Sequence, residues 1–378
     1  MRRSGKSYFL LQIIDKLKTS GVKKKNIVSI NKESMEFDFI ETYKNLNQYV
    51  EAQFKGLKGR KYLFIDEVQE IAKWEKAVIS FFVKGDIDIF ITGSNAHLLS
   101  SELTTLLSGR YIEFSMHTLS FKEFLKFHKI QETKAPEAFT TYLKYGGLPA
   151  LLHFNNDDKT IYQYISSLYD TIILKDICDR HGIRNIHLLK NITRFVLDNI
   201  GNSFSAKSVS DFLKKEKIAI GIKTIQNYLE YLTATFVLYK VERFDIKGKR
   251  LLEFNEKYYL GDIGLRHALI GYREADIGNY LENIVFLELK RRDYQVHIGK
   301  IDNQEIDFVA TRANEKCYIQ VATFLTSEKT VNREFISLER IDDNYPKYVV
   351  TMDTLFGKDF KGIKRLNLID FLLQDALP

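Results

Sequence analysis

The sequence predicts an α/β protein with a parallel sheet near its N-terminus, a helical middle and a second α/β region near its C-terminus. Two apolar runs in the first hundred residues end in acidic or small polar residues, as buried parallel strands do. Helical spacing of apolar residues dominates the middle, and short strand-like runs return towards the end. A chain of 378 residues is too long for one ordinary core, so we expect several domains.

The composition is that of a folded, globular protein. Hydrophobic residues make up 45% of the chain and charged residues 28%, with only 4 prolines. The sequence contains no apolar run near the roughly 18 residues of a membrane span, and its N-terminus leads into a motif instead of a signal peptide. We therefore predict a cytoplasmic protein with no membrane partner. Cys178 and Cys317 stand far apart, which indicates neither a disulfide framework nor a thiolate metal site.

The net charge is +7, and many of the basic residues are clustered. Attraction to phosphate groups and ordinary solubility both account for such clusters. The clusters are Lys23–Lys25, Lys55–Lys61, Lys214–Lys215, Lys247–Arg250 and Lys290–Arg292.

Residues Arg3–Ser7 match the end of a phosphate-binding loop of the Walker A type, and the apolar residues after them predict its helix. Phosphates would then lie at the N-terminus of that helix, held by backbone N–H groups, among them those of Ser4 and Gly5. Lys6 would reach the β and γ phosphates, and Ser7 would bind magnesium.

A second motif, Tyr62–Glu67, runs from four apolar residues straight into two acids. It predicts a buried parallel strand that ends in a Walker B motif. Asp66 would hold magnesium, and Glu67 would act as the general base that polarises the attacking water. A buried strand followed by a solvated acidic turn is the alternative, which the upstream motif disfavours.

The next strand-like run, Asp88–Asn95, ends in small polar residues where a doubly wound sheet places its ligand crevice. Ser94 or Asn95 would sense the γ-phosphate there. Arg110 is a candidate arginine finger, which would act on the nucleotide of a neighbouring subunit, or else a surface arginine near a helix end. Two further elements are expected around it, a helix over 98–108 and a strand over 111–114.

The order and spacing of several short motifs resemble a large family of bacterial and archaeal AAA-type ATPases. These motifs are Gly5–Ser7, Leu63–Glu67, Ile91–Ser94, Ser108–Arg110, Leu119–Phe124 and Gly146–Pro149. The resemblance implies binding and hydrolysis of ATP. If Arg110 is an arginine finger, we expect a homo-oligomer. The family's loop opens with a glycine preceded by an apolar strand, which the motif spacing places before Met1. We therefore expect a truncated N-terminus or a start codon assigned too late. If the sequence is complete, we expect weakened nucleotide binding.

Residues 188–260 fit a winged helix, with three helices followed by two strands. Apolar residues at helical spacing give the third helix, 223–232, one buried face. Its other face and the basic tip of the hairpin would contact DNA, and a protein-interaction module is the alternative. The candidate DNA contacts are Lys223, Gln226, Asn227, Lys247, Lys249 and Arg250.

The C-terminal part places a helix, 280–289, before strand-like runs at 295–298, 305–309 and 317–322. This order is similar to the restriction-endonuclease-like fold, in which two acids and a third polar residue bind magnesium. Glu282, Asp307 and Gln320 match those three positions, whereas Ala322 stands where the fold has a lysine. We therefore expect an inactive nuclease fold, since a cation that stabilises charge is missing. Active cleavage is the alternative if Lys300 or Lys316 takes that role.

The predicted function is an ATP-driven switch coupled to a C-terminal region that binds DNA or a protein. The alternatives are a binding module that no longer hydrolyses ATP and a magnesium-dependent nuclease. The predicted parts are a P-loop ATPase domain at 1–128, a helical connector at 129–187, a winged helix at 188–270 and a nuclease-like domain at 271–378.

Overall fold

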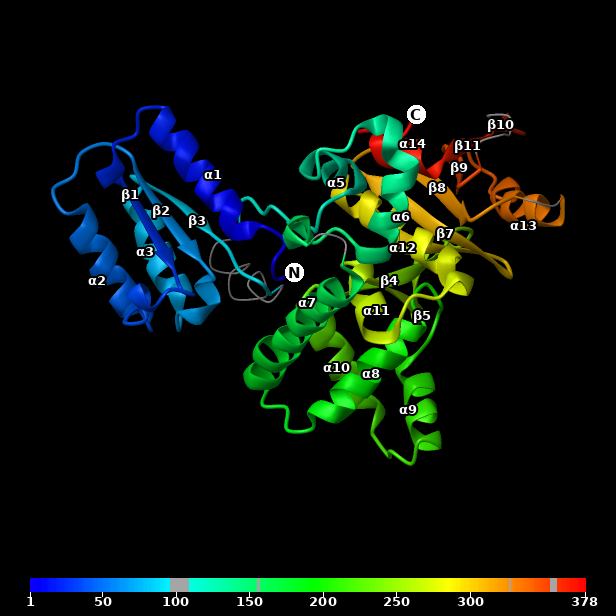
Figure 1. Cartoon of the computed structure of the whole chain (residues 1–378), viewed down its shortest axis with the longest axis horizontal. Coiled ribbons are helices and arrows are strands. Elements are labelled where there is room, and N and C mark those ends of the chain that lie inside the picture. The colour runs from blue at the N-terminus through cyan, green and yellow to red at the C-terminus, as the bar shows by residue number, and fades with distance from the viewer. Residues whose placement is uncertain (96–108, 155–156, 326–327, 354–358) are drawn as a thin grey trace. The chain divides into compact units, whose positions relative to one another are not determined.

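The computed structural model describes residues 1–95, 109–154, 157–325, 328–353 and 359–378 (Figure 1). The chain folds as two compact units, Met1–Met116 and His117–Pro378. Residues 117–128, which the sequence analysis assigned to the ATPase domain, belong to the second unit. Helix α5 (Phe121–Phe127) packs there against α6 (Ala135–Tyr145) and α14 (Leu368–Leu373). Within the described ranges, no helix combines the length and the apolar character needed to cross a membrane.

The first unit is built on a parallel sheet with its strands in the order β1-β2-β3, as the apolar runs predict. The strands are β1 (Ile27–Asn31), β2 (Lys61–Asp66) and β3 (Ile87–Ile91). The helices are α1 (Lys6–Thr19), α2 (Tyr43–Phe54) and α3 (Trp74–Lys84), with short 3₁₀ turns η1 (Lys24–Asn26), η2 (Met35–Phe37) and η3 (Val68–Glu70).

The side chains of β2 alternate between two apolar layers, which fixes the positions of the helices. Phe64 faces α1 and packs with Leu10 and Ile14. Leu63 and Ile65 face the opposite way, into the larger core formed with α2 and α3. Because both faces of β2 are covered, its carboxyl end is held rigidly between the two layers. This end carries the two acids of the Walker B motif.

The strand predicted over 111–114 is not formed, and this prediction was wrong. Ile112 and Phe114 are 80% and 76% exposed. A strand needs a neighbour for its backbone hydrogen bonds, and within the described ranges the sheet of this unit consists of β1, β2 and β3. The helix predicted over 98–108 lies outside the described residues.

The second unit begins with helices and continues into a large mixed sheet. Its helices are α5, α6, α7 (Asp158–Thr171), α8 (Ile186–Asp198), α9 (Ala206–Lys215), α10 (Ile222–Ala234), α11 (Ile263–Ile270), α12 (Ile277–Arg291), α13 (Glu328–Glu339) and α14. The shorter turns are η5 (Glu132–Lys134), η6 (Pro149–His153), the π-helical η7 (Ile172–Asp179) and η8 (Glu274–Asp276). Helices α8, α9 and α10 occupy the positions predicted for the three helices of a winged helix.

Among the described residues, the sheet of the second unit has eight strands in the order β10-β11-β9-β8-β7-β6-β4-β5. They are β4 (Leu238–Asp245), β5 (Arg250–Leu260), β6 (Gln295–Ile301), β7 (Gln304–Arg312), β8 (Glu315–Ala322), β9 (Lys347–Thr351), β10 (Asp359–Phe360) and β11 (Ile363–Asn367). Strand β4 pairs in parallel with β6 through Arg243, Phe244 and Asp245. The hairpin predicted as a wing is therefore continuous with the C-terminal sheet. The predicted boundary between residues 270 and 271 crosses this one sheet.

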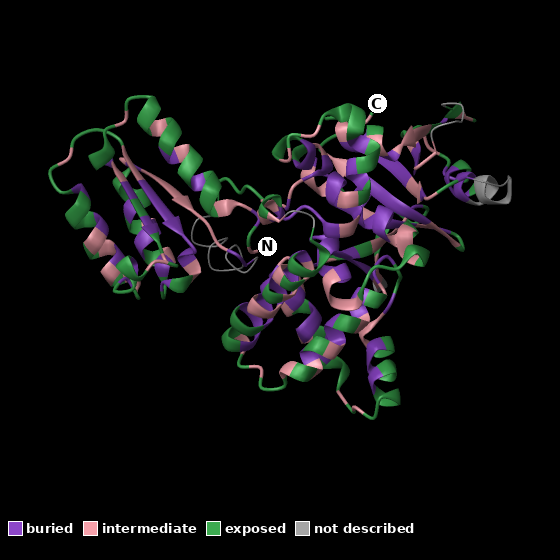
Figure 2. Cartoon of the chain, in the orientation of Figure 1, coloured by how far each residue is buried: buried purple, intermediate pink, exposed green. Residues whose placement is uncertain are grey.

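Helix α12 runs through the centre of the second unit, and every residue from Tyr280 to Leu289 is buried (Figure 2). It packs against strands β5, β6, β7 and β8. A helix surrounded on all sides normally has apolar residues all round, but α12 also carries the buried acids Glu282 and Glu288. Buried carboxylates need partners, and those of Glu282 and Glu288 are described below.

Candidate nucleotide-binding site

The loop at residues 1–5 has the backbone shape of an anion-binding site. Arg3 and Gly5 have positive φ angles of 60° and 102°, and Gly5 caps the N-terminus of α1. Such a loop gathers N–H groups in a concave arrangement, and the helix dipole adds positive potential. The Ser4 hydroxyl and the Lys6 ammonium both donate to the carbonyl oxygen of Met1, each over 3.0 Å. These bonds hold the loop closed around its own backbone.

The two acids of the Walker B motif lie buried at the carboxyl end of β2. Asp66 is 6% exposed and Glu67 is 7% exposed. The hydroxyl of Thr92, which follows β3, donates to a carboxylate oxygen of Asp66 and accepts the backbone N–H of Glu67 over 3.2 Å. Thr92 thereby fixes both acids relative to the neighbouring strand.

The structure brings the two halves of the predicted site together. The Nζ atom of Lys6 lies 3.9 Å from Oε1 of Glu67. The side-chain amide of Gln69 donates to Oε2 of Glu67 and to the Ser94 hydroxyl, the latter over 3.4 Å. Glu67 has a left-handed backbone, with φ 55°, which turns its carboxylate towards these partners. Such strain in a non-glycine residue is typical of functional sites.

Two residues that contact the Walker B acids, Thr92 and Gln69, were not predicted from the sequence. Thr92 stood inside the motif Ile91–Ser94, where a hydroxyl directly after a buried strand was an available signal. Gln69 had no comparable signal, because its role depends on the turn that brings it back to Glu67.

The other predicted residues divide into two groups. Ser94 and Asn95 are buried, at 1% and 3% exposure, in the segment after β3. Ser7 is exposed in the first turn of α1. Arg110 is exposed too, and its guanidinium lies 5.6 Å from the ring centre of Phe82 on α3. The roles of these four residues remain predictions.

The donor set fits a magnesium nucleotide. The loop N–H groups and Lys6 suit the phosphates, while Ser7 and Asp66 offer the hard oxygen ligands that magnesium prefers. Bound magnesium would neutralise charge that develops on the phosphates during hydrolysis. Glu67 has the position for orienting a water molecule, beside the ammonium of Lys6.

The predicted nuclease residues also converge, from three different elements. Glu282 is on α12, Asp307 on β7 and Gln320 on β8, and Gln320 Oε1 accepts the backbone N–H of Asp307 over 3.3 Å. Nevertheless, within the residues that the structure describes, no group of three or more His, Cys, Asp or Glu side chains is arranged to hold a metal ion. The role of Glu282, Asp307 and Gln320 in a nuclease stays a prediction.

The predicted DNA contacts lie on two surfaces of the second unit. Lys223 and Gln226 are exposed on α10, and Asn227 is partly buried. At the tip of the β4–β5 hairpin, Lys249 and Arg250 are exposed. Lys247 at the same tip forms an ion pair with Asp302, at 2.7 Å, which reduces its availability to a partner. DNA contact by these residues remains a prediction.

Two family models match different parts of the chain. A family model described as an AAA domain matches residues 1–125. A model described as a domain of unknown function, DUF8612, matches residues 136–276. The first match includes the loop, Asp66, Glu67 and the segment after β3.

Full-length relatives share both units. A protein of Haemophilus influenzae named only as uncharacterized is 39% identical over 376 residues, which is 99% of this chain and 93% of that protein. Uncharacterized protein MJ1544 of Methanocaldococcus jannaschii is 32% identical, over 90% of this chain and 77% of that protein. Among solved structures, the Walker-type ATPase PABY2304 of Pyrococcus abyssi aligns with a TM-score of 0.49 and 15% identity, over 71% of this chain and 89% of that one. The chain belongs to the family of these Haemophilus and Methanocaldococcus proteins, and its residues 1–125 match the AAA domain model.

Proposed function

We propose that the protein hydrolyses ATP at this site and uses the nucleotide state to change how its second unit holds a partner. The approach of Lys6 to Glu67, at 3.9 Å, carries the first half of the proposal. It puts the group that binds the terminal phosphates beside the group that activates water. Hydrolysis needs these two groups within one substrate's reach.

The residues have separate tasks in this reaction. The backbone of the loop and Lys6 hold the phosphates, and Asp66 with Ser7 holds magnesium. Glu67 orients the attacking water and accepts its proton. Gln69 and Thr92 position the two carboxylates, and neither contacts the reacting atoms.

Binding of a fluorescent ATP analogue, with magnesium present, tests the site directly. We expect saturable binding to the wild-type chain and its loss in Lys6→Ala. Lys16→Ala is the matched control, because Lys16 is an exposed lysine further along the same helix. Binding that survives in Lys6→Ala, or that falls equally in both variants, contradicts the assignment. Binding without turnover would identify a binding module.

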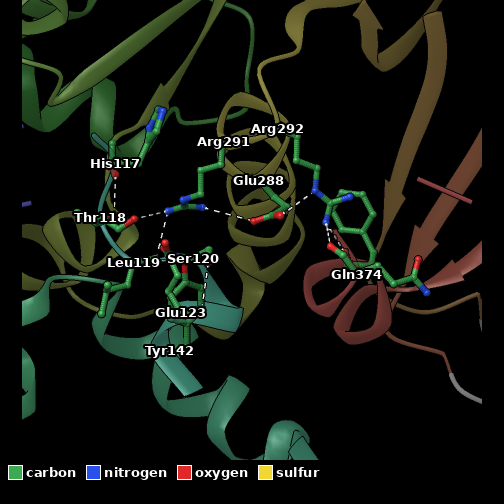
Figure 3. Close-up of polar contacts among 12 residues, drawn as sticks. His117, Thr118, Leu119, Ser120, Glu123, Tyr142, Glu288, Arg291, Arg292 and Gln374 are labelled. Atoms are coloured by element: carbon green, nitrogen blue, oxygen red, sulfur yellow. Dashed lines mark hydrogen bonds and ion pairs between the residues drawn. The ribbon is translucent and has the colours of Figure 1, made fainter. Parts of the chain in front are cut away.

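Coupling between the units rests on how the second unit holds its own first residues (Figure 3). The guanidinium of Arg291 donates to the carbonyl oxygens of Thr118 and Leu119, over 3.1 and 3.3 Å. The hydroxyl of Tyr142 donates to the same oxygen of Leu119 over 2.9 Å, and the N–H of Leu119 donates to the carbonyl of Gly147 over 2.7 Å. The segment that follows the ATPase unit is therefore clamped to the second unit.

Arg291 is the last residue of α12, so the clamp acts on the central helix. Its neighbour Arg292 donates to Oε1 of Glu288 over 2.8 Å and to the carbonyl oxygens of Phe371 and Gln374 (Figure 3). The same end of α12 thus holds both the entry segment and the C-terminal tail. A displacement of the segment at Thr118 would be passed to α12 and to the sheet beneath it.

Hydrogen exchange of α12 amides with and without ATP tests this coupling. We expect a nucleotide-dependent change in the wild-type chain that disappears in Arg291→Met while ATP hydrolysis continues. Arg194→Met serves as the control, because Arg194 is an exposed arginine on α8. Identical exchange in the presence and absence of ATP would rule the coupling out.

For the partner, we propose DNA, because Lys223, Lys249 and Arg250 are exposed cations. Fluorescence anisotropy with duplex and single-stranded DNA, at several salt concentrations, measures the phosphate contacts. Each lost phosphate contact is expected to reduce the slope of the logarithm of the binding constant against the logarithm of salt concentration by about one. Absence of DNA binding at low salt would leave a protein as the partner.

A further inference from the structure

A lysine lies among the acids that the sequence analysis assigned to a nuclease site. Lys257, on β5, is 4% exposed. Its Nζ atom donates to Oε1 of Glu282 over 2.9 Å and lies 2.7 Å from Oε1 of Glu305. The ammonium is therefore paired with two carboxylates at the centre of the cluster.

One carboxylate oxygen of each predicted acid is already bonded within the protein. The hydroxyl of Tyr259 donates to Oε1 of Glu282 over 2.5 Å, the same atom that Lys257 binds. The backbone N–H of Val321 donates to Oδ2 of Asp307 over 2.7 Å. Divalent cations require several open oxygens directed at one point. Each predicted acid instead has at least one oxygen directed at a protein donor.

Two cations already pair with the carboxylates of the cluster. Besides Lys257, Arg243 lies 3.4 Å from Oε2 of Glu305. Lys257 and Arg243 therefore face the carboxylates of Glu282 and Glu305. A divalent ion would have to compete with these two cations for the same carboxylates.

We propose that Lys257 is a built-in cation that occupies the place of a divalent metal among Glu282, Glu305 and Asp307. The cluster is then an ion-pair network that fastens β5 to α12 and β7. It holds the hairpin of the helical middle against the C-terminal sheet, and it does not cleave phosphodiester bonds. Glu282 and Asp307 are retained in this chain for the stability of the second unit.

Manganese binding by wild type and Lys257→Met tests the proposal. Both chains carry Asp66→Asn and are measured without nucleotide, so that the ATPase site does not contribute. Methionine keeps the aliphatic stem but removes the charge, leaving buried carboxylates uncompensated. We expect Mn²⁺ affinity to rise by about tenfold or more over wild type, and adding Asp307→Asn to abolish the gain.

Lys316→Met is the matched control. Lys316 is a partly buried lysine of the same unit that pairs with Asp343, 3.7 Å away, and lies over aromatic rings. Its loss removes an equal charge outside the cluster, so no gain in Mn²⁺ affinity is expected. A gain as large as that of Lys257→Met would contradict a role specific to Lys257.

Thermal unfolding supplies a second measurement. We expect Lys257→Met to lower the melting temperature by on the order of 10 °C, because an unpaired buried carboxylate is costly. Either Mn²⁺ or the second substitution Glu282→Gln should restore part of the loss. If Lys257→Met alone does not fold, recovery of folding in the double variant with Glu282→Gln supports the proposal, and continued failure to fold contradicts it.

Two results would overturn the proposal outright. One is Mn²⁺ binding, or Mn²⁺-dependent nicking of plasmid DNA, by the wild-type chain that Asp307→Asn removes. The other is a folded Lys257→Met chain that binds Mn²⁺ no better than wild type. In the first case, Lys257 would lie beside a bound metal instead of replacing it. In the second case, removing the lysine charge would not create a metal site among the acids.

Discussion

The ammonium of Lys6 lies 3.9 Å from Oε1 of Glu67, which joins the first turn of α1 to the end of β2. Glutamine at position 67 keeps the size of the side chain but cannot accept a proton from water. We expect Glu67→Gln to lower ATP turnover by about 10² or more while ATP affinity changes little. Phosphate release and analogue binding, measured side by side, give the two quantities. Glu70→Gln, an exposed neighbour on η3, should turn over normally; unchanged hydrolysis in Glu67→Gln would contradict the role of Glu67.

Thr92 links the two acids, and its hydroxyl can be removed without changing the shape of the side chain. In Thr92→Val, Asp66 loses a donor and the N–H of Glu67 loses its acceptor. We expect a higher magnesium concentration at half-maximal ATPase activity, with ATP affinity less affected. Titration of magnesium at saturating ATP measures this, and Thr92→Ser should restore the wild-type value. Equal magnesium dependence in the valine and serine variants would show that the hydroxyl has no such role.

Gly147 allows the entry segment to pack directly on its backbone. A Cβ atom at this position would lie 2.2 Å from the carbonyl oxygen of Leu119, which is backbone and cannot rotate away. Gly147→Ala should therefore destabilise the second unit by about 1–3 kcal/mol. At Gly278, in the first turn of α12, the nearest atom would be 3.6 Å away, so Gly278→Ala should be neutral or stabilising. Denaturant unfolding compares the two; similar stabilities would contradict the close contact.

His267 gives the second unit a predictable dependence on pH. Burial, with the positive charge of Arg266, lowers the pKa of His267 from 6.5 to about 4. The unfolded chain therefore binds the proton more readily than the folded chain does. The contribution of His267 to the free energy of unfolding is full above pH 6.5 and is lost as the pH falls towards 4. The expected loss is about 1.4 kcal/mol per pH unit.

Comparison with His267→Gln isolates this effect. Glutamine keeps an N–H donor for the carbonyl of Leu143, 3.2 Å from Nε2, but does not titrate. Burial raises the pKa of Asp262, so the contribution of Asp262 to stability increases as the pH falls. Because both chains contain Asp262, its contribution cancels when their free energies of unfolding are subtracted. Unfolding free energies between pH 4 and 7 should converge as the pH falls. Parallel curves would show that His267 is not held neutral.

The burial of Asp66 and Glu67 at the end of a parallel strand was predictable because the signal is local. Asp66 and Glu67 directly follow a run of apolar residues, and a buried strand is one of the few structures that such a run forms. Lys257 was missed because its partners lie elsewhere in the sequence, on α12 and β7. A charged residue beside the buried Tyr258, Tyr259 and Leu260 was a usable signal, since an apolar strand retains a lysine only when it is paired.

The elements of the second unit were predictable, but their assembly was not. Helices α8, α9 and α10 follow from helical spacing of apolar residues. The pairing of β4 with β6 depends on hydrogen bonds between distant segments, which leave no pattern in either strand. The bond from Arg291 to Thr118 joins residues that are 173 positions apart, so no local pattern predicts it.

The continuity of β4 and β6 in one sheet determines how this protein can be divided. Fragments cut between residues 270 and 271 would each carry a strand whose hydrogen-bonding edge is bare, and such edges adhere to one another. Recombinant expression of the C-terminal half alone would therefore yield aggregates, whereas co-expression of both fragments would allow them to complement each other. The portable module for domain grafting is His117–Pro378, transferred whole.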